Sequence, residues 1–171
     1  KLPEDIRQIV LLLEATGFRI SDTCALKLDC LIHREDGWWI VGEQRKVKDK
    51  THRVPISEDL AKVVLTQQEL TRRKSSVETN PFNYLFPTYG GTRKGQPISR
   101  ENVVNNLNKL AVENNIVSEN GDIYRCKPHA FRHRFGVNLI NNGMNILHVQ
   151  KLMAHASPEM TLVYAQIHDT T

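Results

Sequence analysis

The sequence has no hydrophobic run that approaches the length of a membrane span. A transmembrane helix needs roughly 20 consecutive apolar residues, whereas stretches such as Ile9–Leu13 are far shorter. The start of the chain does not have the charged and apolar pattern of a signal peptide. We therefore expect no membrane partner, and the 171 residues are enough for one domain that buries its own hydrophobic core.

Cysteine is scarce and irregularly placed. Cys24, Cys30 and Cys126 are an odd number of thiols without a regular spacing, which argues against a disulfide framework. Because disulfides persist mainly in oxidising compartments, the simpler expectation for this chain is a reducing compartment.

Acidic residues are missing where basic residues gather. The formal net charge is +4 and the sequence pI is about 9.0, and the positive charge is concentrated in residues 45–53, 72–74 and 125–134. The first of these segments opposes five basic residues with Asp49 alone, and the last contains four basic residues and no acid. Clustered positive charge is the electrostatic footprint of nucleic-acid binding, so we expect an anionic partner.

Residues 126–134, CKPHAFRHR, have the spacing of metal ligands. His129 and His133 lie four residues apart, and Cys126 lies three residues before the first of them. The helical zinc-peptidase pattern needs a glutamate directly after the first histidine, where this chain has Ala130. The basic side chains nearby would also repel a cation, so a zinc site is the less favoured interpretation.

The same segment also fits a phosphate site. His129 and Arg132 lie three residues apart, so on a helix both can face one cluster of phosphate oxygens. The planar fork of arginine can bind two oxygens at once, and such donors stabilise the charge on a phosphodiester transition state. Taken alone, however, this string is short and common, and a solvated basic helix face is then the favoured explanation.

Helical periodicity and capping residues predict most of the architecture. Ser57 and Ser99 stand where they can cap helices, and Gly17 stands where it can end the first helix. The predicted helices cover residues 3–16, 21–28 with Ser21 as the N-cap, 58–74, 100–115, 128–142, 145–155 and 159–167.

Residues 30–56 have a different pattern, which is typical of paired strands. We predict strands at 30–33 and 38–41 around an Asp36-Gly37 turn, and a third strand at 53–56. The basic residues 45–52 then form the tip of the second hairpin. The predicted fold is a single α+β domain over residues 1–171, mainly α with a small three-stranded antiparallel sheet.

At this point the chain resembles the tyrosine recombinases, also called phage integrases. The resemblance is carried by TGFRISDTCALKLDCL, the basic hairpin that ends in RVPI, HAFRHRFGVNLINNG and VQKLMAHASPEMTLVYAQI, and it extends from Glu14 to Ile167. The resemblance implies the catalytic-domain fold of this family and an N-terminal DNA-clamping region outside this chain. The spacing of the basic and tyrosine positions matches the family pattern, namely His129, Arg132, His155 and Tyr164.

The resemblance also implies a role for each matched residue. Tyr164 would be the nucleophile that forms a 3′-phosphotyrosyl link, and Arg19 and Arg132 would bind the non-bridging oxygens of the scissile phosphate. His129 would accept the tyrosine proton or hydrogen-bond the phosphate, and His155 would be a further phosphate donor. A free tyrosine has a pKa of about 10, so nearby positive charge would ease its deprotonation.

In this family a lysine on the β-hairpin protonates the leaving 5′-oxygen. Counted back from RVPI, Lys46 fits that position best and Lys48 is the alternative. The other residues that we expect to contact DNA are basic side chains of the hairpin and of the segment around His129, namely Arg45, Lys48, Lys50, Lys127 and Arg134.

The function implied is site-specific DNA recombination by strand cleavage and rejoining, without a metal or other cofactor. The expected partner is double-stranded DNA at a specific site, bound by a homotetramer on two duplexes, although the isolated domain could be a monomer. A bacterial cytoplasmic, nucleoid-associated location follows from the same resemblance. A non-catalytic DNA-binding module and a type IB topoisomerase remain the alternatives.

Overall fold

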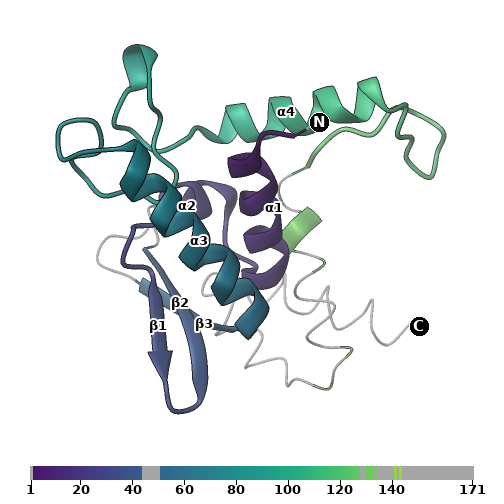
Figure 1. Ribbon diagram of the computed structural model, residues 1–171. Helices are drawn as coiled ribbons and strands as arrows, with labels where there is room; N and C mark the ends of the chain where they lie inside the picture. Colours follow the sequence, from purple (N-terminus) through teal and green to yellow (C-terminus); the bar gives the residue numbers. More distant parts are fainter. Residues whose placement is uncertain are drawn as a thin grey trace.

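The computed structural model of the protein describes residues 2–43, 51–127, 130–132, 134, 141 and 143. Its central element is helix α1 (Glu4–Thr16), which stands between helix α3 (Glu58–Lys74) and helix α4 (Arg100–Glu113) in Figure 1. A three-stranded antiparallel sheet lies beside α3. The mainly helical α+β class predicted from the sequence is confirmed.

Helix α1 is held by one apolar face. Ile6, Ile9, Leu12 and Leu13 recur at helical spacing and are at most 1% exposed, which fits an amphipathic helix packed on a core. Each fully buried side chain of this size contributes roughly 1.5–3 kcal/mol. The helix ends at Gly17, as predicted, because this residue takes a left-handed conformation (φ 67°, ψ 12°) that favours glycine.

The sheet has the strand order β1-β2-β3, with β1 at Leu31–Arg34, β2 at Gly37–Glu43 and β3 at Thr51–Ile56. The predicted hairpin is confirmed, but its turn is Glu35-Asp36 rather than Asp36-Gly37, because Arg34 and Gly37 already pair across it. Ile40 of the central strand β2 pairs with Val54 of β3, and both residues are almost fully buried.

Two serines cap helices as predicted. The Ser57 hydroxyl accepts a hydrogen bond from the Leu60 amide at 3.2 Å, and the Ser99 hydroxyl accepts one from the Asn102 amide at 3.1 Å. Basic residues 72–74 occupy the last turn of α3, where cations interact favourably with the negative end of the helix dipole. This local role accounts for one of the basic clusters without invoking a ligand.

The second helix differs from its prediction. Helix α2 covers Ile20–Cys24, and its N-cap is Arg19 rather than Ser21. The Arg19 carbonyl accepts the Thr23 amide at 3.0 Å, which closes the first helical turn two residues earlier than predicted. The predicted continuation to residue 28 fails because the backbone of Leu26 and Leu28 bonds instead to residues 83–85.

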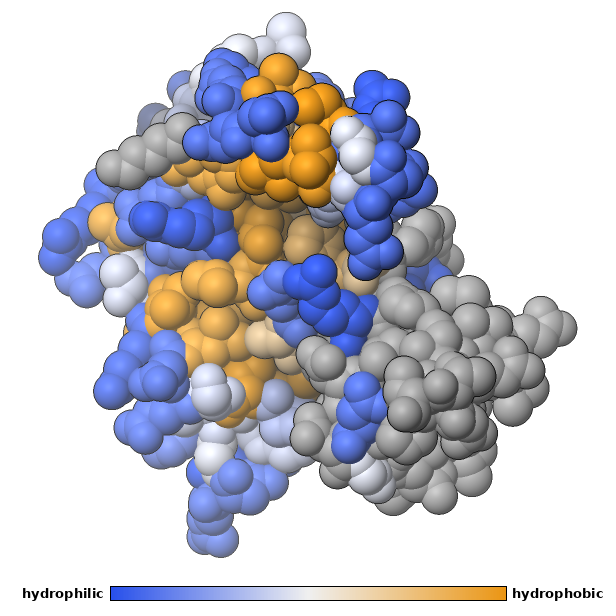
Figure 2. All heavy atoms as spheres, turned by 90° about the vertical axis from the view of Figure 1, so that its right-hand side faces the viewer, coloured by the Kyte–Doolittle hydropathy of each residue, from blue (hydrophilic) through white to orange (hydrophobic). Residues whose placement is uncertain are grey.

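Helix α4 is two residues shorter than predicted at its C-terminal end, and a hairpin-like excursion follows it. Val117 and Ile123 form an isolated antiparallel bridge in this excursion. Large hydrophobic side chains of this region are 41–65% exposed, namely Val112, Ile116, Val117 and Ile123. Figure 2 views the molecule from the side on which this excursion lies in Figure 1 and shows hydrophobic areas separated by hydrophilic ones.

The C-terminal third of the chain is described only in part. Residues 130–132, 134 and 141 are helical, in agreement with the helix predicted at 128–142 at those positions. The helices predicted at 145–155 and 159–167 and most of the basic hairpin tip lie outside the described residues. Within the described part, no helix is long and apolar enough to cross a membrane.

Candidate active site

A tight turn follows the C-terminal end of α1. The Gly17 amide donates to the Leu13 carbonyl at 3.1 Å. The Thr16 hydroxyl, fully buried, donates to the Leu12 carbonyl at 2.7 Å and accepts from the Phe18 amide at 3.2 Å. The backbone of this turn is therefore fixed by side-chain as well as main-chain hydrogen bonds.

The turn receives an arginine from the far end of the sequence. Nε of Arg132 donates to the Gly17 carbonyl at 2.8 Å, and the Arg132 residue is only 9% exposed. A guanidinium stays protonated in proteins, so this contact places a permanent positive charge inside the domain. Arg19 follows Gly17 by two residues, so the structure brings two of the predicted phosphate-binding residues to one turn.

Arg19 has a different setting from Arg132. Its carbonyl accepts hydrogen bonds from the amide and, at 3.1 Å, from the hydroxyl of Thr23, which ties its backbone to the start of α2. Its side chain is half-buried and forms no hydrogen bond or ion pair with another residue in the described part of the chain. The backbone of Arg19 is thus held firmly by hydrogen bonds, whereas its half-buried side chain is not.

Phe18 connects this turn to the sheet. Its ring packs edge-on against the His52 ring of β3, with centroids 4.8 Å apart. A Cβ placed on Gly42 of β2 would lie 2.9 Å from the ring, and Gly42 and His52 are partners in the β2–β3 pairing. The turn at Gly17–Arg19 therefore packs against the end of the β2–β3 pair at which residues 44–50 connect the two strands.

Two predicted DNA contacts lie at the edge of the same region. Arg134 is exposed and pairs with Glu14 near the end of α1 at 3.0 Å. Lys127 is exposed, and its carbonyl accepts the Ala130 amide at 2.9 Å. The sequence predicts Arg134 as a DNA contact, and the structure adds an ion pair with Glu14.

The described thiols are free cysteines in buried positions. Burial raises the pKa of the Cys30 thiol to about 12, and the nearby charge of Asp29 adds to this effect. Burial also raises the pKa of Cys126, against the opposing charge of Arg100. Both thiols are thus held in the protonated form, which reacts poorly and binds metal weakly.

Several predicted site residues lie outside the described part of the chain, namely Arg45, Lys46, Lys48, Lys50, His129, His155 and Tyr164. The sequence predicts Arg19 and Arg132 as site residues, and these stay predictions; it does not indicate the hydrogen bonds of the Thr16 hydroxyl and the Gly17 carbonyl beside them. The signal available was the TGFR string itself, in which a threonine and a helix-ending glycine directly precede the first arginine.

The fold is that of DNA recombinase catalytic domains. The XerH site-specific recombinase in a post-cleavage complex with difH substrate superposes with a TM-score of 0.73 at 17% identity, over 98% of this chain and 43% of that chain. The Tn1549 transposon integrase bound to transposon right-end DNA has a TM-score of 0.65 at 23% identity, over 96% of this chain and 55% of that chain.

The sequence matches the Phage integrase family over residues 1–171, and the chain belongs to this family. It is 42% identical over 171 residues to transposase B from transposon Tn554 of Staphylococcus aureus, which covers all of this chain and 26% of that protein. It is 30% identical over 161 residues to tyrosine recombinase XerA of Pyrococcus furiosus, which covers 94% of this chain and 50% of that protein. The chain thus spans a quarter to a half of the length of these relatives, and the family predicted from its motifs is confirmed.

Proposed function

We propose that the protein cuts and rejoins DNA strands in site-specific recombination through a covalent 3′-phosphotyrosyl intermediate. The observation that carries the proposal is that the buried Arg132 donates to the Gly17 carbonyl, in the turn that also leads to Arg19. Family membership supplies the reaction type, and relatives named transposase and tyrosine recombinase favour recombination over a type IB topoisomerase.

The proposed reaction begins with attack by the Tyr164 hydroxyl oxygen on the scissile phosphorus. The new oxygen–phosphorus bond forms as the bond to the 5′-oxygen breaks, and the tyrosine proton passes to His129. Lys46, or alternatively Lys48, donates a proton to the departing 5′-oxygen as general acid. The phosphotyrosyl bond conserves the energy of the broken diester, so a 5′-hydroxyl of another strand can reverse the reaction without ATP.

The arginines supply the electrostatic part of the proposal. Negative charge accumulates on the non-bridging oxygens as the phosphorus becomes five-coordinate, and Arg19, Arg132 and His155 would bind those oxygens. Preorganised donors of this kind typically contribute the largest single term to catalysis. Because arginine and lysine provide the positive charge, the scheme calls for no divalent metal and no other cofactor.

The proposed partner is double-stranded DNA at a specific recombination site. The XerH structure contains a difH substrate and the Tn1549 integrase structure contains transposon right-end DNA. The basic residues of the hairpin and of 125–134, which include Lys127 and Arg134, are suitable phosphate contacts. Exchange between two duplexes would take four copies of the protein, and the working location would be the bacterial nucleoid.

The decisive experiment traps the covalent intermediate. The recombination site is first identified by sequencing the DNA that the protein retains, and a nicked duplex with that site is then offered to wild type and to Tyr164→Phe. We expect a protein–DNA adduct mapped to Tyr164 with wild type, and equal DNA binding without an adduct for Tyr164→Phe.

Each alternative has its own outcome. Binding without any adduct from wild type would indicate a non-catalytic DNA-binding module. Relaxation of supercoiled plasmid without site preference would indicate a topoisomerase. About one equivalent of zinc in the purified protein, lost on changing Cys126 to alanine, would replace the phosphate role of His129 with a metal site.

A further inference from the structure

We propose that residues Thr16–Phe18 form a positioning device for Arg132, in which the Thr16 hydroxyl fixes the peptide group that orients the guanidinium. The inference rests on the proposed function, because it names residues that serve the same phosphate site. Thr16 and Gly17 would not touch DNA and would act only through Arg132.

The first step concerns the direction of the Gly17 carbonyl. Inside a helix each carbonyl points along the axis toward the amide four residues later. Gly17 leaves this pattern, since its φ of 67° reverses the chain after α1. Its carbonyl oxygen therefore becomes available to a group from outside the helix, and Arg132 is the residue that takes it, 115 positions later in the sequence.

The second step concerns a single peptide unit. The Gly17 carbonyl and the Phe18 amide belong to the same planar peptide group. The Thr16 hydroxyl accepts from the Phe18 N–H of that group at 3.2 Å, while Arg132 Nε donates to its oxygen at 2.8 Å. Because the group is rigid, holding its N–H end also sets the direction of its carbonyl end.

The third step concerns the hydroxyl itself. It donates to the Leu12 carbonyl at 2.7 Å, so both its donor and one of its acceptor positions are engaged within α1 and the turn. Thr16 is fully buried, so water does not compete for these bonds. The hydroxyl thus links the last turn of the helix to the peptide group that holds the arginine.

The final step concerns the guanidinium. Its Nε–H lies in the plane of the group, so a hydrogen bond at Nε sets the direction of that N–H and restrains where the two Nη atoms can lie. A charge-assisted bond of 2.8 Å from a buried arginine is a strong restraint. Small displacements of a catalytic group can cost about a hundredfold in rate, so the geometry of this turn should be visible in the cleavage step.

The test compares threonine variants on the nicked substrate under single-turnover conditions. Thr16→Val keeps the shape of the side chain and removes the hydroxyl, whereas Thr16→Ser keeps the hydroxyl. We expect Thr16→Val to slow adduct formation by roughly tenfold or more with little change in DNA affinity, and Thr16→Ser to recover most of the rate.

A matched control is available on α3. Thr71 is also fully buried, and its hydroxyl donates to the Leu85 carbonyl at 2.7 Å. Thr71→Val removes an equivalent hydroxyl far along the chain from the turn, so it should lower the melting temperature while folded protein cleaves at the wild-type rate. Melting curves for both valine variants keep the comparison to folded protein.

A double-variant cycle tests whether Thr16 acts through Arg132. Arg132→Lys removes the Nε donor, so the peptide group then has nothing to orient. Thr16→Val combined with Arg132→Lys should cleave no more slowly than Arg132→Lys alone.

Equal slowing by Thr16→Val and Thr71→Val, or independent, multiplying losses in the double variant, would overturn the inference. Absence of an adduct from wild type would instead overturn the proposed function, so the two failures are distinguishable.

Discussion

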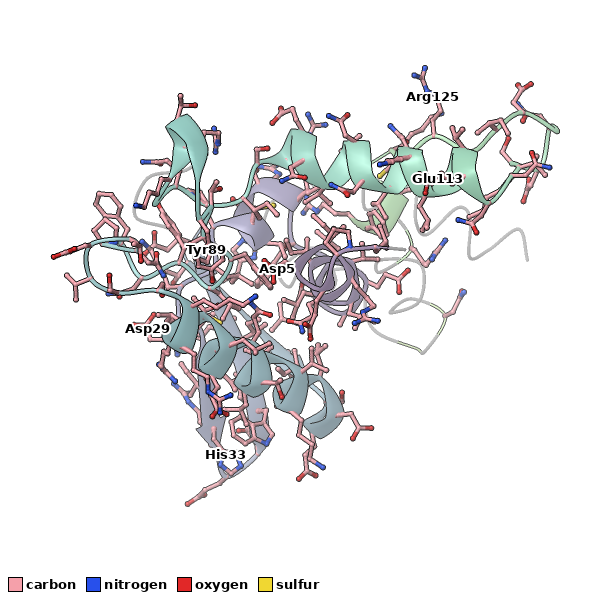
Figure 3. All side chains as sticks on the ribbon, turned by 45° about the horizontal axis from the view of Figure 1, so that its top comes forward. Asp5, Asp29, His33, Tyr89, Glu113 and Arg125 are labelled. Atoms are coloured by element: carbon pink, nitrogen blue, oxygen red, sulfur yellow. The ribbon has the colours of Figure 1, made fainter. Side chains whose placement is uncertain are left out.

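The two ends of α1 bury polar groups in different ways. At the N-terminal end, Gln67 donates to the Asp5 carboxylate at 3.3 Å and to the Thr71 hydroxyl at 3.1 Å. Asp5 and Tyr89 point toward the same area in Figure 3, beside a cavity of about 180 Å³ that Lys74 also lines. At the C-terminal end, the corresponding polar network closes on the guanidinium of Arg132.

The two ends differ in whether their ionisable side chain can become neutral: Asp5 can take up a proton, whereas Arg132 cannot lose one. Burial raises the pKa of Asp5, with Lys74 and Gln67 acting in the opposite direction, so the fold disfavours the charge of this carboxylate. Arg132 stays charged at any ordinary pH. A fold that retains a buried charge of this kind must compensate it with hydrogen bonds or an anion, and the Gly17 carbonyl supplies one such bond. The C-terminal end of α1 therefore holds a fixed positive charge, which the proposed phosphate site would use.

The largest effect should come from the arginines. We predict that Arg132→Ala and Arg19→Ala each slow cleavage by about a hundredfold or more, since each removes a donor to the transition-state oxygens. Single-turnover adduct formation gives the rate, and titration with labelled DNA gives the affinity. Lys74→Ala removes a cation at the other end of the helix and should leave cleavage unchanged. If rate and affinity fell equally, the arginines would bind DNA without a transition-state role.

The next effect concerns the packing of Phe18 against the sheet. Gly42→Ala would place a Cβ 2.9 Å from the Phe18 ring, and overpacking of this kind costs about 1–3 kcal/mol of unfolding free energy. Gly90→Ala is the matched control, because nothing lies within 4 Å of its Cβ position. Urea unfolding of both variants measures the difference, and equal stabilities would show that the ring can move aside freely.

Features of the fold that depend on a few neighbouring residues could be predicted from the sequence. Ser57, Ser99 and Gly17 were assigned correctly because a cap or a helix stop depends on the few residues around it. The sequence predicts the N-cap of α2 at Ser21, whereas the structure has it at Arg19, because its position depends on the hydrogen bonds of the turn before it. No local pattern could predict the bond between Arg132 and Gly17, because it joins segments 115 residues apart.

A smaller effect concerns the ion pair beside the turn. Arg134 and Glu14 expose 66% and 41% of their side chains, and such surface pairs are worth about 0–1 kcal/mol. Arg134→Gln should therefore hardly change the unfolding free energy. If Arg134 contacts a phosphate, as proposed, the variant should weaken DNA binding and reduce the salt slope of log K by about one. An unchanged slope would show that Arg134 does not contact a phosphate and only pairs with Glu14.

The smallest effect returns to the N-terminal end of α1. Because the pKa of Asp5 is raised above 3.8 in the folded state, the folded protein holds this proton more tightly than the unfolded chain does. Its contribution to stability is complete below that value and is lost as the pH rises through the folded pKa. Asp5→Asn should therefore gain stability relative to wild type as the pH is raised from about 3 to about 7, measured by urea unfolding at each pH.

Lys74→Gln, made alone, removes the cation that favours the Asp5 carboxylate. It should make the loss of stability with rising pH steeper than in wild type. A relative gain for Asp5→Asn toward low pH instead would show that Lys74 and Gln67 outweigh burial, and that both ends of α1 hold their charges equally well.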